Sequence, residues 1–503
     1  MISKSDRGIP VRKPPRYDAW FCSRWFLLSL AGLVSLATFT GLATGAPGPY
    51  VLGQITLGFS VYLSLFFLAN RPLINPIQAV IPVFYWWFGV GPALIGTWNY
   101  LIGMPDIALH AQVSGMEALW IVSLGLIFYA IIARLTLNSY PRTGPFARFL
   151  RPNGANYRPR VLIIYLSLIG LSTAALSVLR MMGIHGMEET SFFGGTKTTI
   201  LWVGVIAAVG SIAPFVSSSL MTALSQPWKK IPLIVWILIG IMVVNTFVNA
   251  LLGGMKSPII YLAAFFAVAY ISRHQRPPWL IMVFVGLVFL GIITPFVHYG
   301  RNIALQSGAE DSATRKKIFE EILQDKEAFL PTMKENLNVS IFFRGIYPLA
   351  GELTRRNGLF EGEWKGYTIS WGFEILVPRV FIPNKRDAAI GNFFSQTVGA
   401  DIGVTNREDT LNSAAVSIPF EFVGNYGWAA GVMSFGLIGL FWTLFVAWMV
   451  SPERLSSHPL TPFLSLSVMG MEGPLGHFLA GLRGLLIPLF LCYIVYRFLR
   501  GRI

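Results

Sequence analysis

Residues 427–450 read GWAAGVMSFGLIGLFWTLFVAWMV, an apolar stretch without one charged side chain. A helix of this length is long enough to cross about 30 Å of hydrocarbon. Lipid offers no water to satisfy the backbone N–H and C=O groups, so a stretch that crosses it must be helical. We therefore predict that residues 427–450 form a membrane-spanning helix, and this prediction decides the fold class of the chain.

Similar stretches recur along the sequence. Of the 503 residues, 54% are hydrophobic and 13% are charged, whereas about 25% of the residues of a soluble domain are charged. We predict an all-α membrane protein with about twelve transmembrane helices. Their expected ranges are 25–45, 51–69, 74–97, 117–137, 160–181, 200–222, 231–252, 257–272, 279–298, 427–450, 460–474 and 481–499. The eighth and the eleventh are short, so each is either a tilted span or part of a re-entrant pair.

The positions of Lys and Arg predict the direction of these helices, because cytoplasmic loops are enriched in both residues. With the N-terminus in the cytoplasm, every expected inner loop carries Lys or Arg. The short outer loops carry almost none; these are residues 46–50, 98–116, 182–199, 253–256 and 475–480. We predict both termini in the cytoplasm, with residues 1–298 forming helices one to nine and residues 427–503 forming helices ten to twelve. Residues 299–426 form a large, partly helical extracytoplasmic loop between helices nine and ten.

The net charge of +15 indicates anionic lipid rather than nucleic acid as the partner, because the basic residues lie beside apolar stretches. The outer surface is expected to hold few cations. Those of interest are Lys256, Arg301, Arg344, Arg379, Lys385 and Arg483. Arginine binds phosphate oxygens in pairs and lysine acts as a point charge, so this set suits a lipid pyrophosphate. Alternatively, Arg301 and Arg483 extend along the membrane surface, and Lys385 with Arg386 forms a solvated loop face.

Three residues are candidates for a general base. Glu421 lies between Phe420 and Phe422, just before the helix expected at 427–450. Apolar neighbours that raise the pKa of Glu421 would suit it to accept a proton near neutral pH. Its alternative role is to cap that helix or to pair with an arginine. His298 and His477 are each either a base or a hydrogen-bonded side chain at the membrane surface.

Several classes of protein are disfavoured. The sequence has no nucleotide-binding loop of the Walker A type, and no Cys or His spacing typical of a metal site. No Asp or Glu lies in the middle of an expected span, which argues against a proton- or sodium-coupled transporter. No Asp-x-Asp pair lies at an outer helix end, as a metal-dependent glycosyltransferase would have. We therefore expect no metal and no cofactor.

Five local sequences resemble those of the Wzy-type O-antigen and exopolysaccharide repeat-unit polymerases. They are GGMKS at 253–257, YGR at 299–301, PRVFIPNK at 378–385, PFEFVGNYGWAAG at 419–431 and GLRG at 481–484. The stretches 378–385 and 419–431 are the most specific. The resemblance covers roughly the C-terminal half, and the first half contributes topology alone. The family more often has arginine where this chain has Lys256.

The resemblance implies a metal-independent membrane glycosyltransferase of the bacterial inner membrane. Such an enzyme transfers the growing glycan from undecaprenyl pyrophosphate to an incoming lipid-linked repeat at the periplasmic face. Its partners would be the lipid-linked oligosaccharide, membrane lipid and, as a candidate, a chain-length regulator protein. At the matching positions, the pyrophosphate ligands would be Lys256, Arg301, Arg379 and Arg483, and Glu421 or His298 would be the base.

Other functions stay open. An O-antigen ligase shares the architecture and the lipid-linked donor, but it needs a histidine in its large outer loop, and residues 299–426 contain none. A transporter or flippase of lipid-linked sugars usually shows internal repeats, and none is seen here. A scaffold without catalytic activity in a polysaccharide export complex is a third alternative.

Overall fold

The computed structural model describes residues 26–68, 75–93, 116–139, 279–289, 346–377, 390–402, 416–450 and 461–482, with some single residues between 233 and 486. All the regular structure in these described residues is helical. The fold is therefore all-α over the described part of the chain, as predicted.

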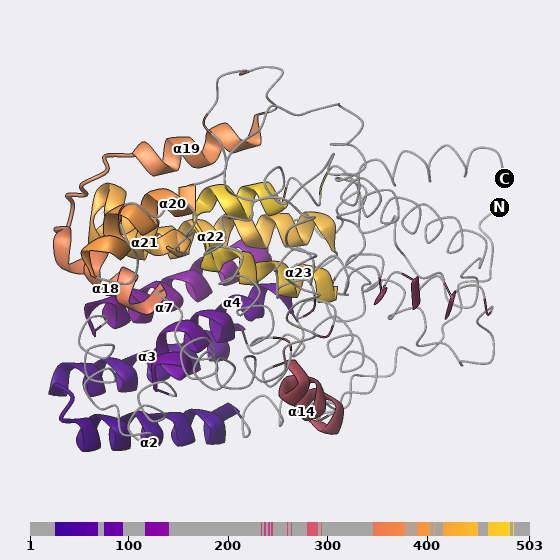
Figure 1. Cartoon of the computed structure of the whole chain (residues 1–503), viewed down its shortest axis with the longest axis horizontal. Helices are drawn as coiled ribbons and strands as arrows, with labels where there is room; N and C mark the ends of the chain where they lie inside the picture. Colours follow the sequence, from indigo (N-terminus) through magenta and orange to yellow (C-terminus); the bar gives the residue numbers. More distant parts are fainter. Residues whose placement is uncertain are drawn as a thin grey trace, which may run out of the picture.

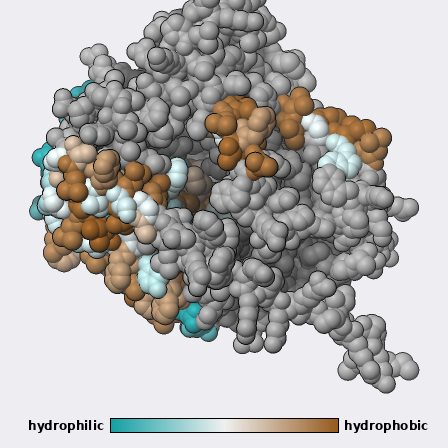
Figure 2. Space-filling view, turned by 90° about the horizontal axis from the view of Figure 1, so that it is seen from below, coloured by the Kyte–Doolittle hydropathy of each residue, from teal (hydrophilic) through white to brown (hydrophobic). Residues whose placement is uncertain are grey.

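Long apolar helices form its framework (Figure 1). They are α2 (Phe26–Thr44), α3 (Gly48–Leu68), α7 (Met116–Ser139) and α22 (Trp428–Met449). Among the described helices, α3, α7 and α22 are long and apolar enough to cross a membrane. Large apolar side chains are exposed along them, and Figure 2 shows hydrophobic surface over the described helices on one face of the molecule. The protein is therefore membrane-embedded.

Helices α7 and α22 pack closely in the same direction. A Cβ added to Gly125 of α7 would collide with Phe435 of α22. One turn further on, a Cβ added to Gly439 of α22 would lie 2.9 Å from the carbonyl oxygen of Tyr129. Small residues at such positions let two helix backbones approach each other in a membrane. Both residue numbers rise together along the contact, so the two helices are parallel.

Helix α3 runs parallel to α7 as well. A Cβ on Gly53 would lie 2.8 Å from the side chain of Leu119 near the start of both helices. Near their ends, the Arg134 guanidinium donates to the carbonyl oxygen of Phe67 at 3.3 Å. Helices α3, α7 and α22 therefore all begin at the same end of the bundle.

Helix α4 (Pro76–Tyr85) continues into the π-helical turn η2 (Trp86–Val90) and runs the opposite way. Its start lies near the end of α22, where the Trp442 indole donates to the Pro76 carbonyl oxygen at 3.0 Å. Its far end lies beside the start of α22, where Phe88 stacks on Phe420 with ring centroids 5.2 Å apart. Residues 76–93 thus lie within the helix expected at 74–97, with a π-helical turn that the sequence did not indicate.

Short helices gather at the end of the bundle where α22 begins (Figure 1). They are α18 (Ile346–Arg356), α19 (Tyr367–Leu376), α20 (Ile390–Phe394), η6 (Ser395–Gly399) and α21 (Ile418–Tyr426). All of them belong to the segment 299–426, which was predicted to be partly helical. Arg356 holds α18 to the segment after η6, because it bonds Glu352 at 2.6 Å and also pairs with Asp401.

The C-terminal part differs from the prediction. Helix α23 (Thr461–Ser467) continues into the 3₁₀ turn η8 (Val468–Glu472), and a break at Gly473 and Pro474 precedes a helical stretch at 475–482. The expected outer loop at 475–480 is therefore wrong, because those residues are helical. Proline is favoured at the start of a helix, so the chain turns before Leu475 rather than after it.

The remaining expected spans are described only in part. Helix α14 (Trp279–Val288) falls within the span expected at 279–298. Single helical residues are described within 231–252 and 257–272. The expected spans 160–181 and 200–222 lie outside the described residues.

Candidate functional site

Glu421 lies on α21 and is fully buried. The helix starts after Ser417, which is extended, with Pro419 in its first turn. It ends at Gly427, whose φ of +85° favours glycine. The Glu421 Oε2 atom accepts a hydrogen bond of 2.6 Å from the backbone N–H of Leu475. Leu475 is the first residue of the helical stretch 475–482, so the carboxyl group faces the positive end of that helix.

The second carboxyl oxygen of Glu421 is unsatisfied. Within the described part of the chain, no group forms a hydrogen bond of regular geometry with Oε1. Burial raises the pKa of Glu421 to about 7, against the opposing effects of the Leu475 amide and the Thr368 hydroxyl. A buried carboxyl group with one free oxygen and a pKa near 7 is suited to proton transfer at neutral pH.

Asn425 fixes the direction of the hydrogen bonds around this carboxyl group. Its Nδ2 donates to the backbone oxygen of Glu421 at 2.7 Å and to Thr368 Oγ1 at 2.6 Å. A backbone oxygen can only accept, so this contact identifies the donating end of the Asn425 amide. Thr368 Oγ1 accepts from Asn425, which leaves its own proton for the Glu421 carboxyl group. Thr368 and Asn425 are therefore positioning residues for Glu421.

The loop between α18 and α19 holds α21 in place. The backbone N–H of Trp364 donates to the Gly424 carbonyl oxygen at 2.9 Å. A Cβ added to Gly362 would collide with the backbone of Asn425. The Trp364 ring in turn packs against Phe393, with ring centroids 5.5 Å apart. Backbone contact on one side and aromatic rings behind it keep water away from Gly424 and Asn425 of α21.

Of the candidate residues of the predicted site, the structure describes Glu421 and His477. The candidate base His298 and the candidate pyrophosphate ligands lie outside the described residues; the ligands are Lys256, Arg301, Arg344, Arg379, Lys385 and Arg483. The ion pairs among the described residues do not include Glu421. The arginines with which it could pair lie outside the described residues, so that alternative stays a prediction. Glu421 does interact with a helix start, but the helix is the one at 475–482 and not α22.

Arg386 is not the solvated loop residue considered from the sequence. Its guanidinium bonds both carboxyl oxygens of Glu374, at 3.0 and 2.5 Å. It also lies over the rings of Tyr367 and Trp371, with its central carbon 4.7 and 5.3 Å from their centroids. Arg386 is thus packed onto α19, and its charge is already balanced by a carboxylate.

Sequence reasoning missed two of the groups around Glu421. Thr368 lies on α19, 57 positions from Asn425, in a stretch with no recognisable motif. The Leu475 amide was missed because residues 475–480 were expected to be a loop. His477, named as a candidate base, lies on the same helical stretch two residues after Leu475. The Gly473-Pro474 pair is a signal that would have placed a helix start at Leu475.

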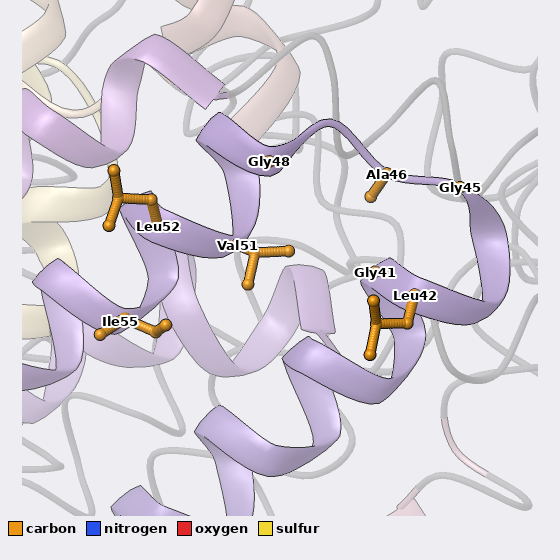
Figure 3. Close-up of a pocket in the computed structure, with 8 residues that line it drawn as sticks. All are labelled: Gly41, Leu42, Gly45, Ala46, Gly48, Val51, Leu52 and Ile55. Carbon is orange, nitrogen blue, oxygen red and sulfur yellow. The ribbon is translucent and has the colours of Figure 1, made fainter.

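A pocket elsewhere has a different character (Figure 3). It lies at the turn between α2 and α3 and is lined by Gly41, Leu42, Gly45, Ala46, Gly48, Val51, Leu52 and Ile55. None of these side chains is titratable, and Leu42 and Leu52 are exposed on apolar helices. The pocket therefore offers apolar contacts and no chemistry of its own.

No protein-family model, no curated protein and no solved structure matches the chain. Among the described residues, no three His, Cys, Asp or Glu side chains lie together as metal ligands would. The function is therefore argued from the Glu421 site and from the sequence.

Proposed function

We propose that the protein is a membrane glycosyltransferase that polymerises lipid-linked oligosaccharide repeats. It transfers the growing glycan from undecaprenyl pyrophosphate to an incoming lipid-linked repeat, with Glu421 as the general base. The proposal draws on two independent supports: the local sequences that resemble the Wzy-type polymerases, and the surroundings of Glu421, which lies within the most specific of those sequences.

The observation that carries the proposal is the state of the Glu421 carboxyl group. Burial brings its pKa to about 7, and Oε1 accepts no hydrogen bond of regular geometry from the described residues. A general base works best when its pKa lies near the working pH, and its contribution is typically about 10²–10⁴-fold in rate.

The reaction would proceed as follows. The carboxylate takes the proton of the acceptor hydroxyl while that oxygen attacks the anomeric carbon of the donor glycan. The bond between the anomeric carbon and the pyrophosphate oxygen breaks, and undecaprenyl pyrophosphate leaves. The proton stays on Glu421 until it passes to water or to the leaving group. Lys256, Arg301, Arg344, Arg379, Lys385 and Arg483 would hold the pyrophosphate charge.

In the described arrangement Glu421 is closed to solvent. An acceptor hydroxyl would therefore reach Oε1 only after α21 and the stretch 475–482 move apart. The hydrogen bond between the Leu475 amide and Glu421 Oε2 would break in this movement. The proposal thus includes an opening step before the chemistry.

The cellular setting completes the proposal. About twelve spans, with both termini in the cytoplasm of a bacterial inner membrane, would place residues 299–426 and Glu421 on the periplasmic side. The helix directions fit this order, since α3, α7 and α22 run together and α4 runs against them. The lipid-linked oligosaccharide is the substrate, and a chain-length regulator protein is a candidate partner.

Reconstitution tests the proposal. The purified protein in lipid vesicles, supplied with lipid-linked repeats from its host, should produce a ladder of polymer on a gel. Glu421→Gln, which has nearly the same shape, should lose the ladder, whereas Glu361→Gln, a change at an exposed glutamate on the adjacent loop, should keep it. Equal ladders from both variants would exclude Glu421 as the base.

The same assay separates the alternative functions. Transfer of a finished glycan to a lipid core, without chain growth, would indicate a ligase. In the host, deletion of the gene should remove long polymer while single lipid-linked repeats accumulate at the outer leaflet. Repeats trapped at the inner leaflet would indicate a flippase instead.

A further inference from the structure

The loop after α18 caps the start of α22. The Gly358 carbonyl oxygen accepts from the Trp428 backbone N–H at 3.0 Å, and the Leu359 carbonyl oxygen accepts from Ala429, also at 3.0 Å. The first N–H groups of a helix have no partner within the helix, so this loop satisfies two of them. Residues 358 and 359 therefore lie at the level of the first turn of α22.

The side chains of this loop are apolar and exposed. Leu359 is 55% exposed and Phe360 is 78% exposed. Tyr426 and Trp428, on either side of Gly427, are exposed as well. An exposed Phe beside an exposed Leu is unfavourable in water. Tyr and Trp carry a polar group on an apolar ring, which suits the boundary between lipid and water.

This surface continues onto the lipid-facing side of α22. Met433, Leu437 and Phe441 are exposed at spacings of four residues along that helix, which places them on one face. With a rise of about 1.5 Å per residue, Phe441 lies roughly 20 Å along the helix from Trp428. Because α22 crosses the membrane, its first turn and the loop that caps it lie at one membrane surface.

We propose that Leu359 and Phe360 insert into the lipid at the membrane surface where α22 begins. The occupant of this surface is the phospholipid itself, with the acyl chains taking the two side chains. Lys365 and Glu361, which are exposed on the same loop, stay among the headgroups or in water. The interaction surface is independent of any catalytic activity of the protein.

The insertion has a structural consequence for α21. The same loop bonds α21 through Trp364 and Gly424. Insertion of Leu359 and Phe360 therefore ties α21 to the membrane surface through a short rigid segment.

Fluorescence quenching tests the insertion. In a chain with Cys22→Ser and Cys492→Ser, Phe360→Cys or Leu359→Cys is labelled with an environment-sensitive fluorophore. The protein is reconstituted in phosphatidylcholine vesicles, either with iodide on both sides or with phospholipid spin-labelled near the top of its acyl chain. Phe441→Cys serves as a control within the span, and Lys365→Cys as a control on the same loop.

Labels at 359 and 360 should be quenched at least several-fold more by the spin-labelled lipid than by iodide, as the label at 441 should be. The label at 365 should show the reverse order. If iodide quenched the labels at 359 and 360 more strongly than the spin-labelled lipid did, as expected for the label at 365, the loop would lie in water and the proposal would be overturned. Resistance to both quenchers would overturn it too, because protein would then cover the two side chains.

Discussion

Glu421 Oε2 and the backbone N–H of Leu475 lie 2.6 Å apart, and 54 positions along the chain separate the two residues. The contact joins α21 to the helical stretch at 475–482. A deprotonated carboxylate would strengthen this hydrogen bond, while burial favours the neutral form. The protonation state of one side chain is therefore coupled to the packing of two segments.

Stability should depend on pH through Glu421. Burial raises its pKa from 4.5 to about 7. The raised value means that the folded state holds the proton more tightly than the unfolded state. The stabilising contribution is complete below pH 4.5 and is lost as the pH rises to 7 and above. The expected loss is roughly 3 kcal/mol at pH 8.

Thermal unfolding in lipid nanodiscs between pH 4.5 and 8 measures this effect. The side chain of the Glu421→Gln variant stays neutral at every pH. The Tm of this variant should therefore fall less between pH 4.5 and 8 than the Tm of the unmodified protein. Other groups, such as Glu363, Glu352 and Asp401, titrate in both proteins. Their effect therefore cancels when the Tm of one protein is subtracted from the Tm of the other at each pH. Parallel pH curves for the two proteins would show that Glu421 is not buried as a carboxylic acid.

Thr368→Val should raise the pKa of Glu421 further. The Thr368 hydroxyl lowers that pKa, and valine has nearly the same shape without the hydroxyl. Asn425 also loses an acceptor, which should destabilise the protein by about 1–3 kcal/mol. A hydrophobic carbodiimide reacts with protonated buried carboxyl groups, so mass spectrometry of the Glu421 peptide follows the titration. The reaction should persist to higher pH in Thr368→Val.

Thr368→Ser is the matched control for this change, because it keeps the hydroxyl and loses a methyl group. Its labelling curve should stay close to that of the unmodified protein. If serine and valine shifted the curve equally, packing rather than the hydrogen bond would be the cause.

Gly427→Ala should destabilise the junction of α21 and α22. The backbone of Gly427 has φ +85° and ψ −178°, a region that is essentially restricted to glycine and costs other residues about 1–3 kcal/mol. A Cβ there would also collide with the Gly358 carbonyl oxygen. The Tm should fall clearly, whereas Gly32→Ala on α2, with no atom within 4 Å, should be neutral or slightly stabilising. A neutral Gly427→Ala would contradict the described turn.

The proposed pyrophosphate ligands make a separate prediction. Lys256→Ala and Arg379→Ala should abolish polymer in the host while the protein stays in the membrane. Arg386→Ala should retain most polymer, because the charge of Arg386 is already balanced by Glu374 and is not available to a pyrophosphate. Polymer length on a gel, with membrane immunoblots as the control, measures all three. Normal chain length in Lys256→Ala and Arg379→Ala would refute their proposed role.

The long helices could be predicted from the sequence because hydrophobic length alone defines them. The spans expected at 25–45, 117–137 and 427–450 agree closely with α2, α7 and α22. The short helices at the end of the bundle were beyond reach, since α19 and α21 are too short for periodicity to define. The outer loop at 475–480 was wrong because the positive-inside pattern says which side a turn occupies but not where the turn falls.

For the site, the predicted pyrophosphate ligands and His298 lie outside the described residues and stay predictions. The aromatic neighbours of Glu421 indicated a buried carboxyl group near a helix start, and the burial is confirmed. Its partners were not predictable, because Thr368 and Leu475 reach it through tertiary packing and lie far away in the sequence. A hydroxyl and a backbone amide carry no charge, so no charge pattern in the sequence indicates them.

The parallel course of α7 and α22 constrains the chain between them. Two helices that cross one bilayer in the same direction start on the same side, so the intervening chain must cross an odd number of times. The five spans expected there meet this parity; they are 160–181, 200–222, 231–252, 257–272 and 279–298. If residues 257–272 formed a re-entrant segment instead of a span, the chain between α7 and α22 would cross the bilayer an even number of times. If the four other expected spans all cross, we predict that this short eighth stretch also traverses the whole bilayer, and a reporter fused on either side of it should switch compartments.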